Sequence, residues 1–424
     1  MLYNIIDYGA VGDGIFDNTD AIQNLIDSIG KCGGTVWIPS GTFVTGPITL
    51  RDNISLYLEN GAVIKAHPDH NKYPQIGNDL MKDYVRNTRK SVIFALNCQN
   101  IAIKGDGIID GSGAAWWDSG EADTKRPRTI QFIRCRNIKI EGIKIINSPC
   151  WTINPICCAD IRISNVTIEN PYHSPNTDGI NPESCSYVKI SGCTIDVGDD
   201  CVAIKSGLET DVLQKKHTCK NIMVDNCIFK HGHGGVVIGS ETSGGVRNIT
   251  VSNCIFENTD RAIRVKTRRK RGGVIENFVI SNLMIDNAIA GITFNEYYNW
   301  GAPEDDIVFS TNKLPVSEDT PVIRNVTVSN VIMRNIIGAG MYFWGLPEMP
   351  IRIINMENLY IETLGSEEGV HSIHANHIDK SFGEGIFMKN VEKLTIRNCS
   401  MDAKGEDIIA ENAIDVMIEK NGQK

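Results

Sequence analysis

Short stretches in which Ile or Val alternates with polar residues recur along the chain, and each ends at a polar corner followed by a second short stretch. An apolar–polar period of two predicts β-strands with one buried face. The stretches start at Asn100, Asn137, Asp160, Tyr187, Asn221, Asn248, Asn277, Asn325 and Val391, mostly 23 to 37 residues apart. Repeats of this length predict an all-β solenoid of stacked coils.

The polar corners occupy equivalent positions in successive coils. Six of them are asparagines: Asn165, Asn226, Asn253, Asn282, Asn330 and Asn398. Stacking would place these side chains one above another, so we expect each amide to hydrogen-bond with the coil above or below it. This ladder is a structural prediction and assigns the asparagines no chemistry.

Four of the thirteen cysteines share another position of the repeat: Cys193, Cys227, Cys254 and Cys399. An odd number of cysteines in a long chain argues against a disulfide framework. Their spacing matches no zinc pattern. Because a free cysteine behaves as a small buried hydrophobe, we expect this column to lie in the core.

One amphipathic segment precedes the repeats. Its apolar residues follow helical spacing: Ala21, Ile22, Leu25, Ile26 and Ile29. Asp17 or Asn18 can cap the start of this helix, and Gly33 is expected to end it. A solenoid exposes a strand edge at its end, so the helix is predicted to cover that edge.

Composition predicts one soluble globular domain over residues 1–424, with the cap helix and first irregular coils in 1–85 and the main solenoid in 86–424. The formal net charge of −9 argues against nucleic acid or a membrane surface as partner. The opening "MLYNIIDYGAVGDG" lacks the pattern of a signal peptide. We therefore expect a cytoplasmic protein, or a secreted one if the sequence is a mature form.

Aligning the coils by their repeat gathers polar residues that lie far apart in the sequence. The coils from Tyr187 and Asn221 align without a gap, which places Asp199 over His233 and Asp200 over Gly234. The next coil puts Lys266 in register with Gly239 and Lys205, and Arg264 lies two residues earlier on the same face. Past an insertion, Asp178 aligns with Asp200. Equivalent positions of stacked strands are about 4.8 Å apart, so these side chains should form one patch.

The patch combines three carboxylates, one imidazole and two cations. Such a set suits glycoside hydrolysis, in which one carboxylic acid protonates the leaving oxygen and a second carboxylate activates water or attacks the sugar. Crowding of carboxylates raises the pKa of one of them, as the acid requires. The alternative interpretation is a tight turn whose acids are merely balanced by the cations. Four motifs in register argue against that alternative.

The motifs "NTD" (176–178), "GDD" (198–200), "GHG" (232–234) and "RVK" (264–266) resemble, in this order and spacing, the polygalacturonase family of glycoside hydrolases (family 28). The opening "DYGAVGDGIFDNTDAIQNLID" resembles the start of that family. The resemblance implies a right-handed parallel β-helix. The stretches "GVVIGSETSGGVRN" and "TRRKRGG" resemble its exo-acting bacterial branch.

The resemblance also implies roles. The reaction would be inverting hydrolysis of α-1,4-linked galacturonic acid residues, without a cofactor or a metal ion, on an anionic pectic oligosaccharide. The implied catalytic residues are Asp199 as general acid, Asp178 and Asp200 as the pair that positions and deprotonates water, and His233 as a residue that tunes the acid or contacts substrate. The implied substrate-binding residues are Arg264, Lys266, Asn176 and Tyr297 (or Tyr298, in "FNEYYNWG"). We add Arg268 because it lies beside them in the basic run "TRRKR" (267–271), which we interpret as a guide for an anionic uronide rather than as a solvated face.

Three other functions stay open. A hydrolase of rhamnogalacturonan or xylogalacturonan would use the same residues. A calcium-dependent pectate lyase would share the solenoid but needs a calcium cage and an arginine base. A non-catalytic carbohydrate-binding β-helix would explain the repeats alone. Adjacent rungs also place two carboxylates at a separation nearer to that of retaining enzymes than of inverting ones. The oligomeric state stays open as well.

Overall fold

The computed structural model describes residues 1–76, 89–117, 125–210, 217–302, 305–376 and 378–419. The chain divides into two compact units, Met1–Asp199 and Asp200–Lys424. The single domain expected from composition stays a prediction, and residues 77–85 of its N-terminal region lie outside the described residues. Within the described residues, no helix has the length and apolar character needed to cross a bilayer.

The predicted cap helix is confirmed. Helix α1 spans Thr19–Ile29 and continues as the 3₁₀ turn η2, Gly30–Cys32, after which Gly33 turns the chain with φ of 69°. The backbone N–H of Thr19 donates to the Asp17 carboxylate, whereas the Asn18 side chain binds backbone groups of other segments instead. Asn18 thus occupies the N-cap position without a side-chain capping bond, and the Asp17 carboxylate accepts from the first helical N–H instead. The apolar face is buried at Ile22, Leu25, Ile26 and Ile29.

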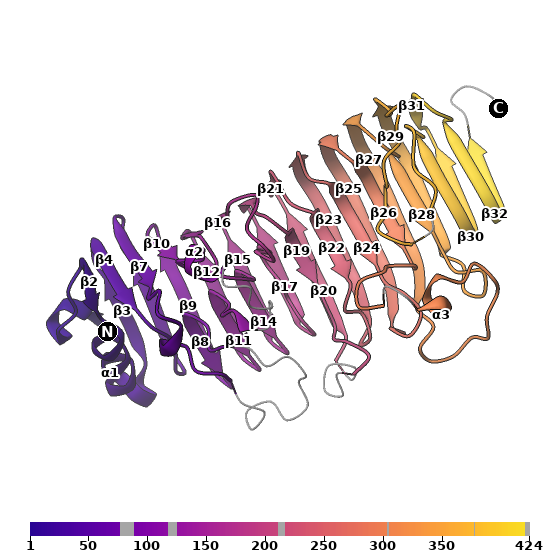
Figure 1. The fold of residues 1–424 in the computed structure, drawn as a ribbon. Helices are drawn as coiled ribbons and strands as arrows, with labels where there is room; N and C mark the ends of the chain where they lie inside the picture. The colour runs from indigo at the N-terminus through magenta and orange to yellow at the C-terminus, as the bar shows by residue number, and fades with distance from the viewer. Residues whose placement is uncertain (77–88, 118–124, 211–216, 303–304, 377, 420–424) are drawn as a thin grey trace. The chain divides into compact units, whose positions relative to one another are not determined.

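Each coil of the first unit contributes strands to parallel columns (Figure 1). The first column is β1 (Leu2–Asn4), β3 (Gly34–Ile38), β6 (Ile54–Leu58), β9 (Gln99–Gly105), β12 (Arg136–Glu141), β15 (Ala159–Ser164) and β17 (Ser186–Ser191). The second is β2 (Asp13–Asp17), β4 (Gly41–Thr45), β7 (Ala62–Ala66), β10 (Ile108–Asp110), β13 (Lys144–Ile146), β16 (Thr167–Glu169) and β18 (Thr194–Asp196). The third is β5 (Ile48–Thr49), β8 (Ile93–Leu96), β11 (Ile130–Ile133) and β14 (Ile153–Ile156). Three short helical segments complete this unit: η1 (Ile5–Tyr8), η3 (His70–Lys72) and α2 (Ala114–Trp117).

The second unit continues the same pattern with longer strands that run through the corners. One side holds β20 (Cys219–Asp225), β21 (Ile228–Phe229), β23 (Val246–Glu257), β25 (Val274–Ala288), β27 (Val322–Ile336), β29 (Arg352–Thr363), β30 (Ile386–Arg397), β31 (Ser400–Asp402) and β32 (Ile408–Glu419). The other holds β19 (Asp200–Ile204), β22 (Gly234–Gly239), β24 (Arg261–Lys266), β26 (Ala290–Asn295) and β28 (Met341–Trp344), which pairs with the start of β30. A short helix, α3 (Asp306–Phe309), lies in the insertion between β26 and β27. All pairings of these strands are parallel, so each unit is built as a parallel β-helix.

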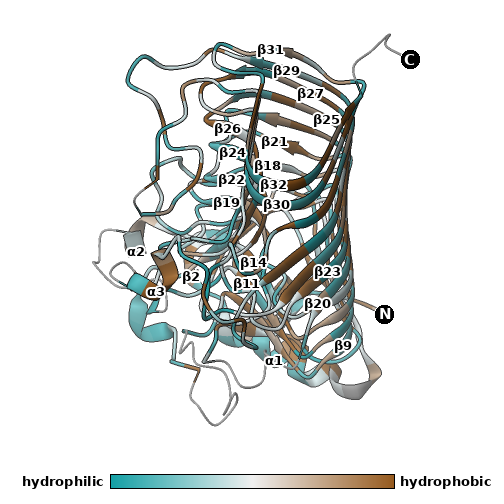
Figure 2. Cartoon of the chain, turned by 90° about the vertical axis from the view of Figure 1, so that its right-hand side faces the viewer, coloured by the Kyte–Doolittle hydropathy of each residue, from teal (hydrophilic) through white to brown (hydrophobic). Residues whose placement is uncertain are grey.

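The core follows the alternation seen in the sequence, and hydrophobic and hydrophilic positions alternate along the strands in Figure 2. Cys193, Cys227 and Cys254 are buried as predicted, while Cys399 is partly exposed. In the second unit this column continues with apolar residues, since Cys254 pairs in register with Leu283. The thirteen cysteines all lie in the described part of the chain, and none of them forms a disulfide bond.

In the second unit the asparagine ladder is confirmed from Asn253 through Asn282 to Asn330, whereas Nδ2 of Asn226 donates to its neighbour Asp225. Asn282 donates to Asn253 at 3.0 Å and accepts from Asn330 at 3.0 Å. Each of these residues has a positive φ near 55°, a left-handed conformation that asparagine tolerates better than most residues. The sequence did not reveal a second ladder, in which Asn248 bonds to Asn221 and Asn277 bonds to Asn248, each at 2.9 Å.

Candidate active site

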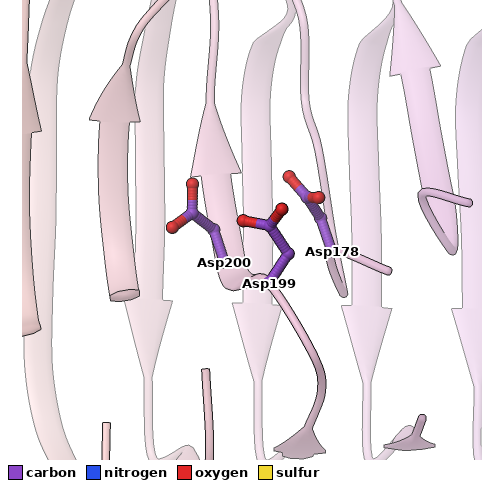
Figure 3. A group of neighbouring side chains, drawn as sticks. All are labelled: Asp178, Asp199 and Asp200. Carbon is purple, nitrogen blue, oxygen red and sulfur yellow. The ribbon is translucent and has the colours of Figure 1, made fainter. Parts of the chain in front are cut away.

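In the first unit, Asp178 and Asp199 bring two carboxylates together. Each offers an oxygen within 4.8 Å of the other (Figure 3). Asp178 is 3% exposed, and its Oδ2 accepts a 2.7 Å hydrogen bond from Asn181 Nδ2. Asp199 is partly exposed and ends this unit. Two carboxylates at this distance cannot both ionise freely, so the pair can supply one protonated acid.

Asn176 connects this carboxylate pair to a buried arginine. Its Nδ2 donates to Asp199 Oδ2 at 3.4 Å, and its Oδ1 accepts from Arg126 Nη2 at 2.6 Å. Arg126 also donates to the carbonyls of Pro149 and Pro175. These bonds fix which way the Asn176 amide faces. Arg126 was missed because it lies in a loop outside the repeat, where coil alignment gives no signal.

In the second unit, the predicted register is confirmed. Asp200 pairs with Gly234, and Gly239 pairs with Lys266. A Cβ at Gly234 would lie only 3.1 Å from Asp200 Oδ1, so the absent side chain leaves the carboxylate its space. The predicted stacking of Asp199 over His233 and of Asp178 against Asp200 stays a prediction. His233 itself is exposed.

Two buried cations contact Asp200. Lys266 Nζ lies 2.6 Å from Asp200 Oδ2, and Arg264 Nη1 lies 3.8 Å from Oδ1. All three side chains are at least nine-tenths buried. The cations therefore do balance an acid, as the alternative interpretation held.

Lys205 shares the column of Lys266 but has a different environment. Its Nζ lies 3.0 Å from Glu241 Oε2 and donates to the carbonyl of Gly239. Both partners of this ion pair are buried. Lys205 is therefore a structural residue that ties β19 to the segment after β22.

Tyr298 faces the cations, whereas the predicted Tyr297 does not. Tyr297 is 1% exposed and packs on Trp344, with ring centroids 4.6 Å apart. The ring of Tyr298 is partly exposed and lies below Arg264 and Lys266, at 5.5 and 5.4 Å from their charged groups. Of the two tyrosines that the sequence left open, Tyr298 therefore lies beside these cations, and which of them binds substrate stays a prediction. The two residues follow the end of β26, where strand alternation no longer tells which side chain faces outward.

The arginines of the basic run 267–271 are buried and paired with acids of the same unit. Arg268 and Arg271 both pair with Glu209, at 3.0 and 2.9 Å. Arg269 pairs with Glu348 through two hydrogen bonds of 2.6 and 3.0 Å. Only Lys270 in this run is exposed. The motif alone did not predict this pairing, because the counterions come from loops outside it. A substrate contact by Arg268 stays a prediction.

Two further residues of the second unit were missed: His374, which contacts Arg264, and Arg261, which lies within electrostatic range of Arg264. His374 accepts a 2.9 Å hydrogen bond from Arg264 through Nδ1. Arg261, at the start of β24, donates to the carbonyls of Ser372 and His371. Burial, reinforced by Arg264, lowers the pKa of Arg261 to about 9, so its guanidinium remains charged at neutral pH. His374 lies about 110 residues from its partner and belongs to no repeat, so the sequence held no signal for it.

Known proteins identify the family of the chain. The profile of "Glycosyl hydrolases family 28" matches residues 75–341, which contain all four motifs. The chain belongs to this family. A probable polygalacturonase of Vitis vinifera is 29% identical over 371 residues, covering 84% of this chain and 74% of the relative. An endo-polygalacturonase of Pectobacterium carotovorum is 29% identical over 298 residues, covering 66% and 72%.

A solved relative confirms the fold of this family 28 chain. The hyperthermoactive exopolygalacturonase of Thermotoga maritima superposes with a TM-score of 0.76 at 29% identity, covering 97% of this chain and 92% of that one. The predicted right-handed parallel β-helix is therefore confirmed. So is the prediction of a glycoside hydrolase of the polygalacturonase type. The relatives include exo-acting and endo-acting enzymes, so they do not decide the mode of action.

Proposed function

We propose that this family 28 hydrolase removes α-1,4-linked galacturonic acid residues from the ends of oligogalacturonides. One observation carries the proposal: the buried cations Arg264 and Lys266 lie over the Tyr298 ring beside Asp200, in a chain with a net charge of −9. A guanidinium binds a carboxylate in a bidentate fashion, and a flat aromatic ring suits the face of a sugar. A local basic site in an acidic protein selects for an anionic sugar.

The proposed roles follow from the contacts. Asp199 protonates the leaving oxygen, because its carboxylate lies beside that of Asp178 and can hold a proton in that crowded setting. Asp178 and Asp200 position and deprotonate water. His233, which is exposed, tunes the acid or contacts substrate. Asn176 orients Asp199 through the Arg126 contact and can also bind the sugar.

Exo action is supported by covered sheet faces in each unit. In the first unit, Gln131 and Asn154 continue the side that holds Asn181, and all three are fully buried. Ile76 packs on the same side of the sheet against Ile133. In the second unit, Tyr342 and Trp344 lie on the side of Arg264 and Lys266 and are covered by a cluster that includes Ile373. Among the described residues, these parts of the sheet face in each unit are covered, which suits the end of a short chain better than a long polymer.

A time course of products from a defined oligogalacturonide tests this proposal. We expect galacturonic acid as the only product, full activity in chelator, and no ultraviolet-absorbing product. A mixture of intermediate sizes from the first time point would show endo action. Unsaturated products, or loss of activity in chelator, would show a lyase. The same assay on rhamnogalacturonan and xylogalacturonan should give no comparable turnover if homogalacturonan is the substrate.

The stereochemistry of the product is a separate question. The resemblance implies inversion, whereas oxygens of Asp178 and Asp199 within 4.8 Å are closer than the roughly 6.5–9.5 Å typical of inverting pairs. We propose inversion, with Asp178 and Asp200 holding the water. Proton NMR of the first-formed anomer should show the β product from an α linkage. A first-formed α anomer would assign the pair a retaining mechanism.

A further inference from the structure

A strap of residues 364–376 follows β29 and is fixed to the strands that carry the cations. Arg261 Nε donates to the carbonyl of Ser372 at 2.9 Å, and its Nη2 donates to that of His371 at 2.7 Å. Asn295 Nδ2 donates to the carbonyl of His374 at 2.8 Å. The backbone of the strap is therefore held by side chains from two different coils, β24 and β26.

The underside of the strap is packed. Ile373 is 2% exposed and belongs to a hydrophobic cluster with Tyr342 and Trp344. Ser372 Oγ accepts from the backbone N–H of Ala339 at 3.1 Å. Ile373 packs against the sheet, and Ser372 and the backbone of His374 hydrogen-bond to residues of the strands and their connections. These contacts fix the direction of the His374 side chain.

The contact with Arg264 fixes the tautomer of His374. Arg264 Nη2 lies 2.9 Å from His374 Nδ1. A guanidinium can only donate, so Nδ1 must be the acceptor and the proton of the neutral ring lies on Nε2. His374 is exposed, so this Nε2–H donor is available to a ligand.

The surroundings keep the ring neutral. Desolvation of the ring lowers the pKa of His374 well below its ordinary value, and Arg264, Arg261, Lys266 and His233 lower it further. A neutral ring with a fixed tautomer acts as an uncharged donor among cations. Such a donor makes a hydrogen bond of defined geometry to a ligand, whereas the neighbouring groups contribute mainly positive charge.

We propose that His374 is a substrate-recognition residue: its Nδ1 holds Arg264 in place, and its Nε2–H donates to the carboxylate of the galacturonate unit bound by Arg264. This rests on the proposed function for the class of ligand. It adds a contact from a segment that lies beyond the family match, which ends at residue 341. The strap then contributes a substrate contact to the binding site in addition to burying apolar residues.

The experiment compares three variants. Asn can present an oxygen near the position of Nδ1 but no group at Nε2, so His374→Asn keeps the Arg264 contact and loses the donor. His374→Leu loses both. We expect KM for digalacturonate to rise about tenfold or more in His374→Leu and by a smaller factor in His374→Asn, with kcat changed less than about threefold. His371→Leu is the matched control, because this exposed histidine holds Arg261 with its backbone and not with its side chain.

Several results would overturn the proposal. If His374→Leu had the wild-type KM, His374 would have no role in recognition. If His374→Asn had the wild-type KM, the Nε2–H group would not donate to the substrate. An equal rise in His371→Leu would assign the effect to general loosening of the strap. Thermal melting of each variant identifies misfolding, and in that case His374→Gln, which keeps an amide donor near Nε2, must bind more tightly than His374→Leu.

A binding readout separates this proposal from the proposed function. Calorimetric titration of digalacturonate into the Asp199→Asn protein, with and without His374→Leu, measures recognition without turnover. Weaker binding in the double variant supports the role of His374 even if the wild type releases no product. Equal binding contradicts it even if the enzyme is an exo-hydrolase.

Discussion

Lys266 and Asp200 form a buried ion pair of 2.6 Å that joins the end of β24 to the start of β19. Lys266→Met would remove the closer of two cations and leave Arg264 Nη1 at 3.8 Å from the carboxylate. Removing one partner of a buried pair costs on the order of 3–5 kcal/mol, because the other charge stays buried. We expect lower unfolding free energy in denaturant titration together with lost turnover. The double variant Asp200→Asn/Lys266→Met should regain stability but not activity, and a double variant as unstable as the single one would contradict this account.

Asp199→Asn should abolish hydrolysis. The substitution keeps the shape of a partly exposed side chain and removes the proton that the leaving oxygen requires. We expect kcat to fall by at least about a hundredfold, the lower range for lost acid catalysis, with an unchanged melting temperature. Substantial residual turnover would assign the acid to another residue.

The neighbouring tyrosines should behave differently. Tyr298→Ala removes the ring below Arg264 and Lys266, so KM should rise while the melting temperature changes little. Tyr297→Ala creates a cavity against Trp344 and should cost roughly 3–5 kcal/mol of stability. Kinetics and thermal melting of the two proteins check the pair. Loss of substrate affinity in a stable Tyr297→Ala protein would support Tyr297 as the substrate-binding tyrosine.

Glu296 should make stability depend on pH. Burial raises the pKa of Glu296 well above its ordinary value, and the nearby Glu348 raises it further. Its Oε2 accepts from the N–H of Leu346, and no partner for Oε1 is found among the described residues. Above about pH 4.3 the unfolded chain releases this proton while the folded chain keeps it, so stability is lost as pH rises.

Glu296→Gln removes that proton release. The variant should therefore melt at a higher temperature than the wild type near pH 8, and the difference should shrink towards pH 4. Melting curves across this range provide the test. A difference that is constant with pH would mean that the effect is one of packing alone.

Asn282 has φ of 55° and bonds to Asn253 and Asn330. Substitutions at this residue can separate the stability that comes from the hydrogen bonds from the stability that comes from tolerance of the left-handed backbone. Asn282→Gly loses the hydrogen bonds but tolerates the left-handed backbone, whereas Asn282→Ala loses both advantages. We expect Ala to be less stable than Gly by about 1 kcal/mol in denaturant unfolding. The opposite order would show that backbone conformation is not what selects asparagine here.

The sequence predicted well wherever consecutive coils align without insertions. Asp200 and Gly234, or Gly239 and Lys266, were paired correctly because stacked strands convert equal spacing into contact. Prediction failed where loops supply the partner. Glu209 and Glu348 neutralise the basic run, and neither is marked by any period.

The same limit explains the missed residues. Arg126 and His374 belong to segments outside the strands, so their positions depend on tertiary contacts that no local pattern encodes. The four site segments could be identified from the order of their motifs, because equivalent positions of successive repeats lie on the same face of the solenoid. It could not say which of two adjacent tyrosines faces the cations, since both follow the last residue of β26, Asn295.

The anchoring of the strap has a consequence for how the chain matures. In most solenoids each coil contacts only its neighbours, so a nascent chain can complete one coil after another as it leaves the ribosome. Arg261 and Arg264 are made about 110 residues before the groups that they bind in the strap. During that interval β24 can already add to the growing solenoid, but the guanidinium groups of both arginines still lack their partners in the strap and must be hydrated by water. Translation therefore delays the burial of these cations until the strap emerges, and a chain that ends before it would display them to solvent.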